Sequence, residues 1–424
     1  MMTENHKSPN NQEKLMKLME KGVKIFNPNS IHIGEDVDTD RISGEGVVLY
    51  TGCKISGKDT LILSGTKLGY EAPVTIENCQ IGPDVELRGG FFCNSVFLAG
   101  SSMGSCAHVR DACILEEEAN GAHLVGIKHT ILFPFVTLGS LINFCDCLMA
   151  GGTSRKNHSE VGSSYIHFNY TPNQDKATPS LIGDVHRGVM LDKPPIFLGG
   201  QGGLVGPAKL GFGIVIAAGS IIRSDFLEEN KLISGSILNY KCSDFYPGLY
   251  LSIQRQVLNN INYVANLIAL SFWYKEIRSR FFQESPMKKE LYKGALEKLN
   301  IATQERIERF KAFVQKLPES VKICHEIMKE KASERLISQK KELFNKWSEI
   351  EDIFYTSREN DIKSDEKLLF SEKIDAVREK TGNDYIRVIQ GLDRNCREIG
   401  SKWLKSIVDR TNEEVLKVIP TFNI

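Results

Sequence analysis

The chain has 424 residues, of which 41% are hydrophobic, so it is long and apolar enough for a large core and, by length, about two domains. Its 53 basic residues balance its 53 acidic residues, so no net charge draws the whole chain to nucleic acid or to an anionic membrane. We therefore predict a globular protein with neither nucleic acid nor membrane as a partner.

The polar N-terminal stretch MMTENHKSPNNQEK excludes a secretory signal peptide. The longest mostly apolar run, Tyr263–Tyr274, is too short to span a bilayer. Ten cysteines occur without a CxxC motif, and the pair Cys145 and Cys147 is only a weak metal signal. We expect a cytoplasmic protein with reduced thiols, and we predict no metal site.

Residues 1–30 are predicted to hold one short helix, NQEKLMKLMEKG, which ends at Gly22, and a linker. Residues 31–250 are rich in Gly, Val, Ile, Leu and Cys, with turn residues between short apolar strings. This texture predicts many short strands.

The segment LVGPAKLGFGIVIAAGSII repeats every six residues, because Leu204, Leu210, Ile216 and Ile222 are all aliphatic. A hexapeptide repeat is typical of a parallel β-helix, in which three short strands form one triangular coil and one aliphatic residue in six points inward. We predict a β-solenoid of this kind over residues 31–250, in preference to a sandwich of short strands.

Earlier hexads are predicted at Ile33, in IGEDVD, and through the series Cys79, Val85, Phe91 and Phe97. The phase slips in CKISGKDTLILSG and ILEEEANGAHLVG, where we expect loops or irregular coils.

Two polar motifs within the repeats have a structural and a functional interpretation. The run Glu116–His123 is expected to be a solvated loop rather than a carboxylate cluster for a metal. The stretch GGQGG, Gly199–Gly203, is expected to be a coil corner, because neither a Lys-Ser pair nor a helix start follows it, as a phosphate-binding loop would require.

Residues 251–424 are predicted to form an all-α C-terminal domain. Gly is scarce there, Lys, Glu and Arg are dense, and apolar residues recur at helical spacing, as at Ile261, Val264, Ile268, Trp273 and Ile277. Breaks are expected near Pro286, Pro318 and Gly382. The size of this region suggests oligomer contacts or a cap on the last coil.

Three motifs together resemble one known family: LVGPAKLGFGIVIAAG, FNYTPNQDKATPSLIGD (Phe168–Asp184) and GTSRKNHSEVG (Gly152–Gly162). They are similar to motifs of the left-handed β-helix acyltransferases, in particular the acetyltransferase half of the bacterial bifunctional enzyme that makes UDP-N-acetylglucosamine. The resemblance implies a left-handed parallel β-helix, acetyl-CoA or another acyl-CoA as co-substrate, and a homotrimer.

The chain departs from this family in three respects. Nothing resembles the Gly-rich loop of the family's nucleotidyltransferase domain, so uridylyl transfer is not expected. Only 12 residues separate His158 from Tyr170, fewer than in the family. LINFCDCLMAGG stands where a Lys-rich strand would be expected.

Acetyl transfer to an amine requires a base, oxyanion donors and a slot for the pantetheine arm. We predict His158 as the base, because the pKa of His lies near neutral pH, and His167 as the second candidate. The oxyanion donor would be a backbone N–H in Gly162–Ser164.

The predicted binding residues come from the same motifs. Arg155 and Lys156 would hold a sugar phosphate or the CoA phosphates. The resemblance implies that Asn169 and Tyr170 contact the acyl donor, that Lys176 contacts the substrate, and that a narrow corner receives pantetheine at Ala217, Ala218 and Gly219. The alternative is that His158 and its neighbours form only a solvated surface loop.

We therefore expect a CoA-dependent acetyltransferase acting on an amino-sugar phosphate or a nucleotide sugar. Two alternatives stay open. The first is a non-catalytic β-helix scaffold or sugar-nucleotide-binding protein. The second is a subunit of a sugar-1-phosphate nucleotidyltransferase whose catalytic partner is another chain.

Overall fold

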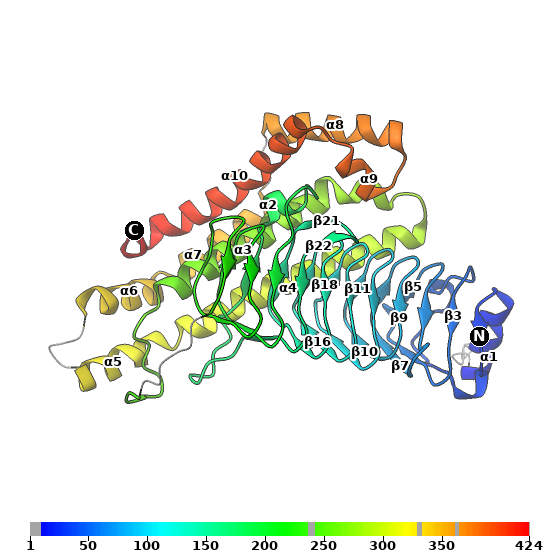
Figure 1. Ribbon diagram of the computed structural model, residues 1–424, viewed down its shortest axis with the longest axis horizontal. Coiled ribbons are helices and arrows are strands. Elements are labelled where there is room, and N and C mark those ends of the chain that lie inside the picture. Colours follow the sequence, from blue (N-terminus) through cyan, green and yellow to red (C-terminus); the bar gives the residue numbers. More distant parts are fainter. Residues whose placement is uncertain (1–9, 236–241, 329–332, 361–363, 424) are drawn as a thin grey trace, which may run out of the picture.

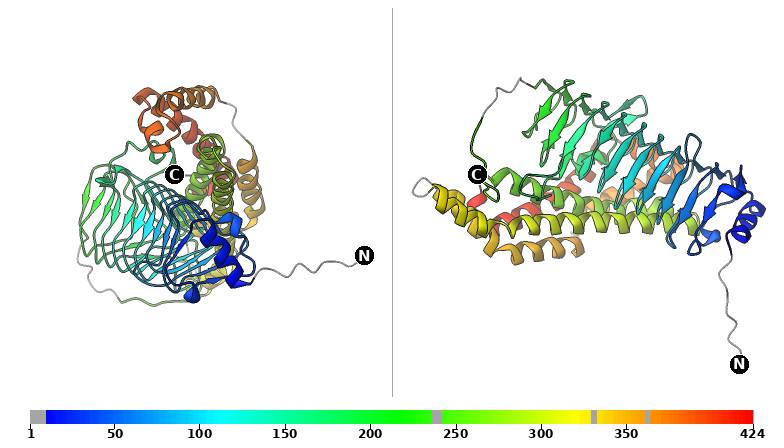
Figure 2. Two further views of the ribbon diagram at one scale, coloured as in Figure 1. Left: turned by 90° about the vertical axis from the view of Figure 1, so that its right-hand side faces the viewer. Right: turned by 90° about the horizontal axis from the view of Figure 1, so that it is seen from below.

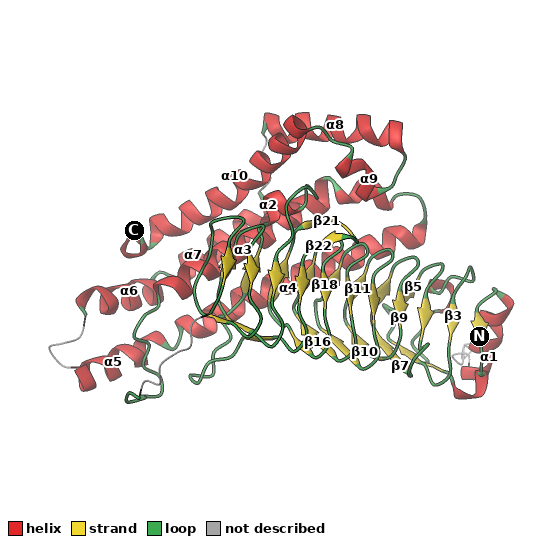
Figure 3. Cartoon of the chain, viewed as in Figure 1, coloured by secondary structure: helices red, strands yellow, loops and turns green. Residues whose placement is uncertain are grey.

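The computed structural model describes residues 10–235, 242–328, 333–360 and 364–423. A parallel β-helix runs along the long axis of the molecule, and a helical region lies along one of its sides (Figures 1 and 3). Most of the polar N-terminal stretch lies outside the described residues. Among the described helices, none is both long and apolar enough to cross a bilayer.

Helix α1 (Asn11–Glu20) closes the N-terminal end of the β-helix. Asn10 begins it with a capping box, in which Asn10 and Glu13 bond each other's backbone N–H groups. Lys14 donates hydrogen bonds to the carbonyl oxygens of Gly34, Glu35 and Val37 at 2.7–2.8 Å. The helix thus supplies partners for backbone groups of the first coil that have no preceding coil to bond.

Three sheets form the three faces of the solenoid, which we call faces A, B and C. Face A contains eleven strands: β1 (Lys24–Ile25), β3 (Val48–Leu49), β6 (Lys67–Leu68), β9 (Glu86–Leu87), β12 (Ser102–Met103), β15 (Asn120–Gly121), β18 (Thr137–Leu138), β23 (Glu160–Val161), β26 (Phe197–Leu198), β29 (Val215–Ile216) and β31 (Leu232–Ile233).

Face B contains ten strands: β2 (His32–Ile33), β4 (Lys54–Ser56), β7 (Val74–Glu77), β10 (Gly90–Cys93), β13 (Ala107–Arg110), β16 (Val125–Lys128), β19 (Ile142–Asn143), β24 (Ile166–Phe168), β27 (Gly203–Val205) and β30 (Ile221–Ile222).

Face C contains eight strands: β5 (Leu61–Ile62), β8 (Gln80–Ile81), β11 (Val96–Phe97), β14 (Ile114–Leu115), β17 (Ile131–Leu132), β20 (Cys147–Met149), β25 (Ser180–Ile182) and β28 (Lys209–Leu210). The chain visits the faces in the order A, B, C, and we name the corners between them the AB, BC and CA edges. The triangular section is seen end-on in Figure 2.

The predicted hexads from Leu204 are confirmed. Leu204, Leu210, Ile216 and Ile222 lie in β27, β28, β29 and β30, one on each successive face, and all four are buried. Parallel pairing stacks each on the equivalent residue of the neighbouring coil, for example Leu198 on Ile216. The β-helix fold is therefore confirmed.

The predicted phase is wrong at Phe91. Phe91 points outward and packs against His108, while its neighbour Phe92 points into the core. Ile81 pairs with Phe97 one coil later, so this coil is two residues shorter than three hexads. The slips in the repeat arise from such short and long coils rather than from loops, because strands continue through both segments.

Three excursions interrupt the later coils. A hairpin, β21 (Gly152–Ser154) with β22 (Asn157–His158), projects at the CA edge. A second CA-edge excursion holds helix α2 (Val185–Gly188), and residues 169–179 form a loop at the BC edge.

The helical region consists of α3 (Gln254–Glu276), α4 (Pro286–Val314), α5 (Leu317–Met328), α6 (Glu334–Asn345), α7 (Trp347–Glu359), α8 (Asp365–Thr381), α9 (Tyr385–Gln390) and α10 (Arg394–Val418). Pro286 is the first residue of α4, and Gly382, with φ of 87°, ends α8. Helix α4 contacts β5, β8, β11 and β14, and α3 contacts β25. The region therefore lies lengthwise on face C and does not cap the last coil (Figure 2).

Face C accepts these helices because its outward residues are apolar. In its two-residue strands the first residue points outward, and six of the eight strands bury an aliphatic side chain on that side: Leu61, Val96, Ile114, Ile131, Leu148 and Leu181. Face A places polar residues such as Lys67, Glu86 and Glu160 at the equivalent positions. Face C therefore gains from being covered along most of its length.

The expectation of a solvated loop at Glu116–His123 is wrong, because its acidic end is buried beneath the helices. Tyr274 donates a hydrogen bond to Glu116 at 2.6 Å, and Arg278 pairs with Glu117 at 2.6 Å. The buried Arg278 guanidinium lies 3.7 Å from the centre of the Tyr385 ring. These contacts anchor the helical region to the solenoid.

We expect Leu68→Asp to abolish stable folding, because it removes a fully buried side chain and puts a carboxylate without a partner in the core. The loss should exceed about 4 kcal/mol. Chemical denaturation monitored by circular dichroism measures it. Lys67→Asp, at the adjacent outward position of β6, is the matched control and should unfold like the wild type.

We expect Glu116 to lower stability as the pH rises from about 4.5 to about 7, because burial raises the pKa of Glu116 to about 7. The folded state then holds a proton that the unfolded state has released, so the free energy of unfolding should fall by up to about 1.4 kcal/mol per pH unit. In Glu116→Gln this component should vanish, whereas the exposed-site control Glu45→Gln should keep it. Equal pH profiles for wild type and Glu116→Gln would contradict the assignment.

Candidate functional site

The residues predicted from the motifs lie on three different edges of the solenoid. Arg155, Lys156 and His158 belong to the CA-edge hairpin, Asn169, Tyr170 and Lys176 to the BC-edge loop, and Ala217, Ala218 and Gly219 to the AB edge. Within one chain the coil thus separates these three groups.

The CA-edge hairpin is held by its own predicted site residues. One nitrogen of Arg155 donates to the carbonyl oxygens of Glu118 and Phe135 and to the Thr137 hydroxyl at 2.8–3.1 Å. His158 Nδ1 lies 2.9 Å from the Arg155 carbonyl oxygen, and its Nε2 lies 3.6 Å from Glu160. Arg155 therefore fixes the hairpin to the two coils beneath it.

His167 points into the solenoid core, in the inward position that Leu204 takes on the next coil. Its Nδ1 lies 2.6 Å from the Cys145 carbonyl oxygen and its Nε2 lies 2.7 Å from the Ser180 hydroxyl. Burial lowers the pKa of His167 to about 4. Both ring nitrogens of His167 therefore have partners inside the core.

The AB edge is built largely from small residues on three successive coils: Gly162–Ser164, then Gly199, Gly200 and Gly202, then Ala217–Gly219. A Cβ on Gly199 would lie 2.4 Å from the Ala218 nitrogen, so close stacking of corners explains the glycines of GGQGG. At Gly219, with φ of 74°, the described chain places no atom within 4 Å of a Cβ. The last corner is therefore open on its outer side.

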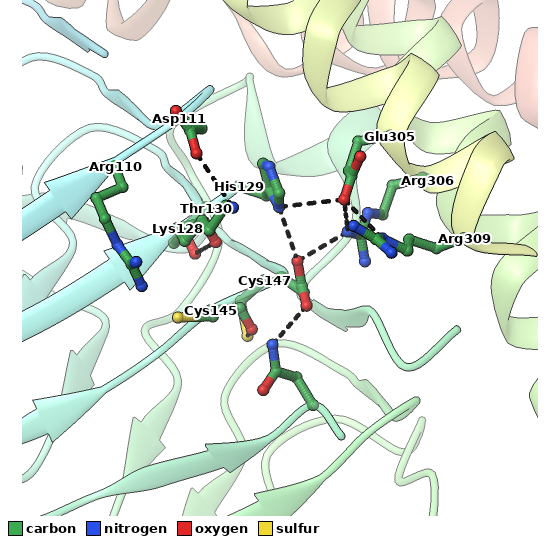
Figure 4. Close-up of polar contacts among 12 residues, drawn as sticks. Arg110, Asp111, Lys128, His129, Thr130, Cys145, Cys147, Glu305, Arg306 and Arg309 are labelled. Carbon is green, nitrogen blue, oxygen red and sulfur yellow. Dashed lines mark hydrogen bonds and ion pairs between the residues drawn. The ribbon is translucent and has the colours of Figure 1, made fainter. Parts of the chain in front are cut away.

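The BC edge holds a polar cluster that combines His129 of the solenoid with Glu305 and Arg306 of α4 (Figure 4). Asp146 accepts a hydrogen bond from Asn169 Nδ2 at 2.6 Å, lies 3.3 Å from His129 Nδ1, and pairs with Arg306 of helix α4 at 2.9 Å. Burial alone would raise the pKa of Asp146, but the charge of Arg306 and the hydrogen bonds of His129 and Asn169 outweigh it and hold that pKa well below its usual range.

A cavity of about 190 Å³ opens beside Asp146. Its lining has more cationic than acidic residues and combines the solenoid with α4: Arg110, Lys128, His129, Asn143, Cys145, Asp146, Asn169, Lys176, Glu305, Arg306 and Arg309. Five side chains in this set are Lys or Arg, and two are acidic. Such a lining favours a small anionic ligand.

The His129–Asp146 pair gives this cavity a group for proton transfer. Because Nδ1 of His129 faces Asp146, Nε2 is the ring atom left to exchange a proton with a ligand. A carboxylate that orients a His in this way is the arrangement general-base catalysis uses. Among the predicted site residues, Asn169 and Lys176 share this cavity, whereas Tyr170 is exposed beside it.

Sequence reasoning missed Arg110, Lys128, His129, Asp146 and the arginines of α4. A signal for the first three was present, because HVRD and GIKH occupy the same strand ends one coil apart, with Arg110 paired to Lys128. Asp111 and His129 follow them at the corner. Nothing local to α4 indicated which coil its arginines would face.

The fold defines the chain as a hexapeptide-repeat β-helix protein with an appended helical region. No protein-family profile matches it. Over about half its length it is similar to curated bacterial proteins, each called Bifunctional protein GlmU, which confirms the resemblance drawn from the motifs.

Three of these relatives illustrate the extent of the similarity. The Synechococcus elongatus protein is 28% identical over 204 residues, 48% of this chain and 40% of the relative. The Thermotoga maritima protein is 26% identical over 212 residues, which are 50% of this chain and 42% of the relative. The Koribacter versatilis protein is 30% identical over 224 residues, which are 50% of this chain and 40% of the relative. The chain spans about two fifths of the length of these relatives.

Proposed function

We propose that the protein is a CoA-dependent acetyltransferase whose acceptor is the amine of an amino-sugar phosphate or a nucleotide sugar. The observation that carries the proposal is the convergence of Asn169 and Lys176, from the matched motif, with the His129–Asp146 pair in one cationic cavity. Similarity to proteins called GlmU and to acetyltransferase motifs supports the same class.

In this mechanism His129, not His158 or His167, is the base. Its Nε2 accepts the proton of the attacking amine, while Asp146 stabilises the imidazolium that forms. The amine nitrogen attacks the thioester carbonyl of acetyl-CoA, and the tetrahedral intermediate collapses to the amide with CoA thiolate as leaving group. The imidazolium returns its proton to the thiolate.

The remaining residues of the cavity bind rather than react. Lys128, Lys176 and Arg110 hold the negative charge of the acceptor. Arg155 and Lys156, which stabilise or flank the CA-edge hairpin, have no part in this site. Because its substrates are metabolites and its ten cysteines are free, we propose a cytoplasmic protein.

The active assembly is proposed to be a homotrimer. Faces A and B carry exposed apolar residues near the C-terminal end of the solenoid: Phe197, Val215 and Leu232 on A, Ile166 and Ile221 on B. Exposed apolar clusters of this kind are typical of subunit interfaces. Ala217, Ala218 and Gly219 lie on the edge between these faces, so they reach a BC-edge cavity only from a second subunit, where they would receive pantetheine.

A non-catalytic binding protein is the second candidate. The specific observation in its favour is the separation of the three motif groups on three edges of one chain. In that case the cavity would bind an anionic sugar without turnover. An acyl-transfer assay decides between the two functions.

We expect His129→Ala to lower turnover of acetyl-CoA with glucosamine 1-phosphate by about two to four orders of magnitude, the usual loss for a general base. Thiol release measures the rate. His158→Ala is the matched control, because it removes an imidazole at another edge, and it should retain full turnover. The proposal fails if His158→Ala is inactive and His129→Ala is not, while absence of turnover by the wild type across amino-sugar phosphates and nucleotide sugars favours the binding protein.

We expect light scattering to give three times the mass of the chain, and Val215→Glu to give the monomer. A carboxylate at this outward position of β29 would be desolvated in the interface but exposed in the monomer, so the secondary structure should be unchanged. Lys67→Glu, at the equivalent outward position near the other end of face A, should remain a trimer. A monomeric wild type would contradict the trimer and the shared site.

A further inference from the structure

Arg306 of helix α4 faces the solenoid at a position where the helical spacing of α4 places buried residues. The buried residues of α4 at this helical spacing include Leu299, Ala302, Arg306, Phe310 and Phe313. Arg306 is 2% exposed in its side chain, yet it stands among apolar residues. A buried arginine among apolar residues requires hydrogen-bonding or charged partners.

Asp146 satisfies only part of the hydrogen-bonding capacity of the Arg306 guanidinium. The Nη2 atom of Arg306 lies 2.9 Å from Asp146 and 3.8 Å from Glu305. Its Nε and Nη1 atoms are buried and have no hydrogen-bond partner among the described residues. Buried guanidinium N–H groups without a partner are costly, and Arg306 lines the cavity into which a ligand could bring acceptors.

Arg309 lies one turn away on the same side of α4 and also lines the cavity (Figure 4). Its Nε donates to Glu305 at 2.7 Å, and 42% of its side chain is exposed. Across the cavity stand Lys128, which pairs with Asp111 at 3.1 Å, and Lys176. Asp146 and Glu305 leave a surplus of positive charge.

We propose that the helical region completes the cavity as a phosphate site, with Arg306 and Arg309 of α4 binding the phosphate group of the acceptor opposite the lysines of the solenoid. A phosphate offers several acceptor oxygens and a double negative charge, which suits both the free N–H groups of Arg306 and the excess of cations. The assignment to the acceptor, rather than to the phosphates of CoA, rests on the proposed function, because His129 in the same cavity must meet the amine. The helical region lies outside the motif resemblance, so this role belongs to the part of the chain that the resemblance does not describe.

The test is calorimetric titration of the full-length protein with inorganic phosphate, glucosamine 1-phosphate and CoA. Arg306→Lys keeps the charge beside Asp146 but loses the extra N–H groups, and Arg309→Gln changes a partly exposed side chain. Each should weaken phosphate and glucosamine 1-phosphate binding about tenfold or more, as expected for one charge-assisted hydrogen bond, and leave CoA binding unchanged. Lys293→Gln, an exposed cation elsewhere on α4, is the matched control and should bind as the wild type does.

Three results would overturn the proposal: no phosphate binding by the wild type, equal binding by wild type and by both arginine variants, or loss of CoA binding instead of phosphate binding. Arg306→Lys should melt at the wild-type temperature, and if it does not, Arg309→Gln alone decides. Phosphate binding that depends on the arginines without any acyl transfer would contradict only the proposed function. Acyl transfer that depends on His129 but not on the arginines would contradict only the phosphate site.

Discussion

The architecture depends on burial of apolar surface on both sides of one sheet. Every face of the solenoid sends apolar side chains into the core, but face C also carries aliphatic residues outside, from Leu61 to Leu181. Such a sheet is unstable in water on its outer side, and the two long helices α3 and α4 remove that surface from solvent. The position of the helical region, and hence of everything it contributes, follows from this one column.

Covering face C changes the chemistry of the BC edge. A polar cluster at the corner of an isolated solenoid would be hydrated, and its charges would be weakly coupled. Beneath α4, Asp146 is buried and bonded by His129, Asn169 and Arg306 at once. The low pKa of Asp146 follows from this enclosure by cations and donors, which outweighs the cost of its burial. At the far side of the same face, Glu116 has fewer compensating partners, and burial raises its pKa instead.

The triangular coil also decides which residues can act together. Residues close in sequence are carried to different edges within a few positions, whereas residues one coil apart are stacked. Arg110 stacks on Lys128, and the backbone N–H of His129 donates a hydrogen bond to the carbonyl oxygen of Asp111. The residues of each pair are a full coil apart in the sequence. His158 and Asn169, which are close in sequence, lie on different edges. A motif of consecutive residues in a solenoid therefore spans more than one edge. Residues at the same position of successive coils lie together and are the better candidates for one site.

The sequence by itself determined the repeat and the inward residues from Leu204 to Ile222, because the hexad of aliphatic residues is a local pattern that only stacked coils satisfy. It also contained the apolar outer column of face C and the stacked pair of Arg110 and Lys128, which become visible once the coil length is known. The tertiary structure alone decided that His167 is a core residue, since only its pairing with Leu204 on the next coil shows which side of β24 points inward. It alone also decided that Arg306 meets Asp146, because the two are 160 positions apart and their contact depends on how α4 lies along the sheet. Local periodicity specifies which face of each element is buried, but the partner across that face is selected only when the elements pack.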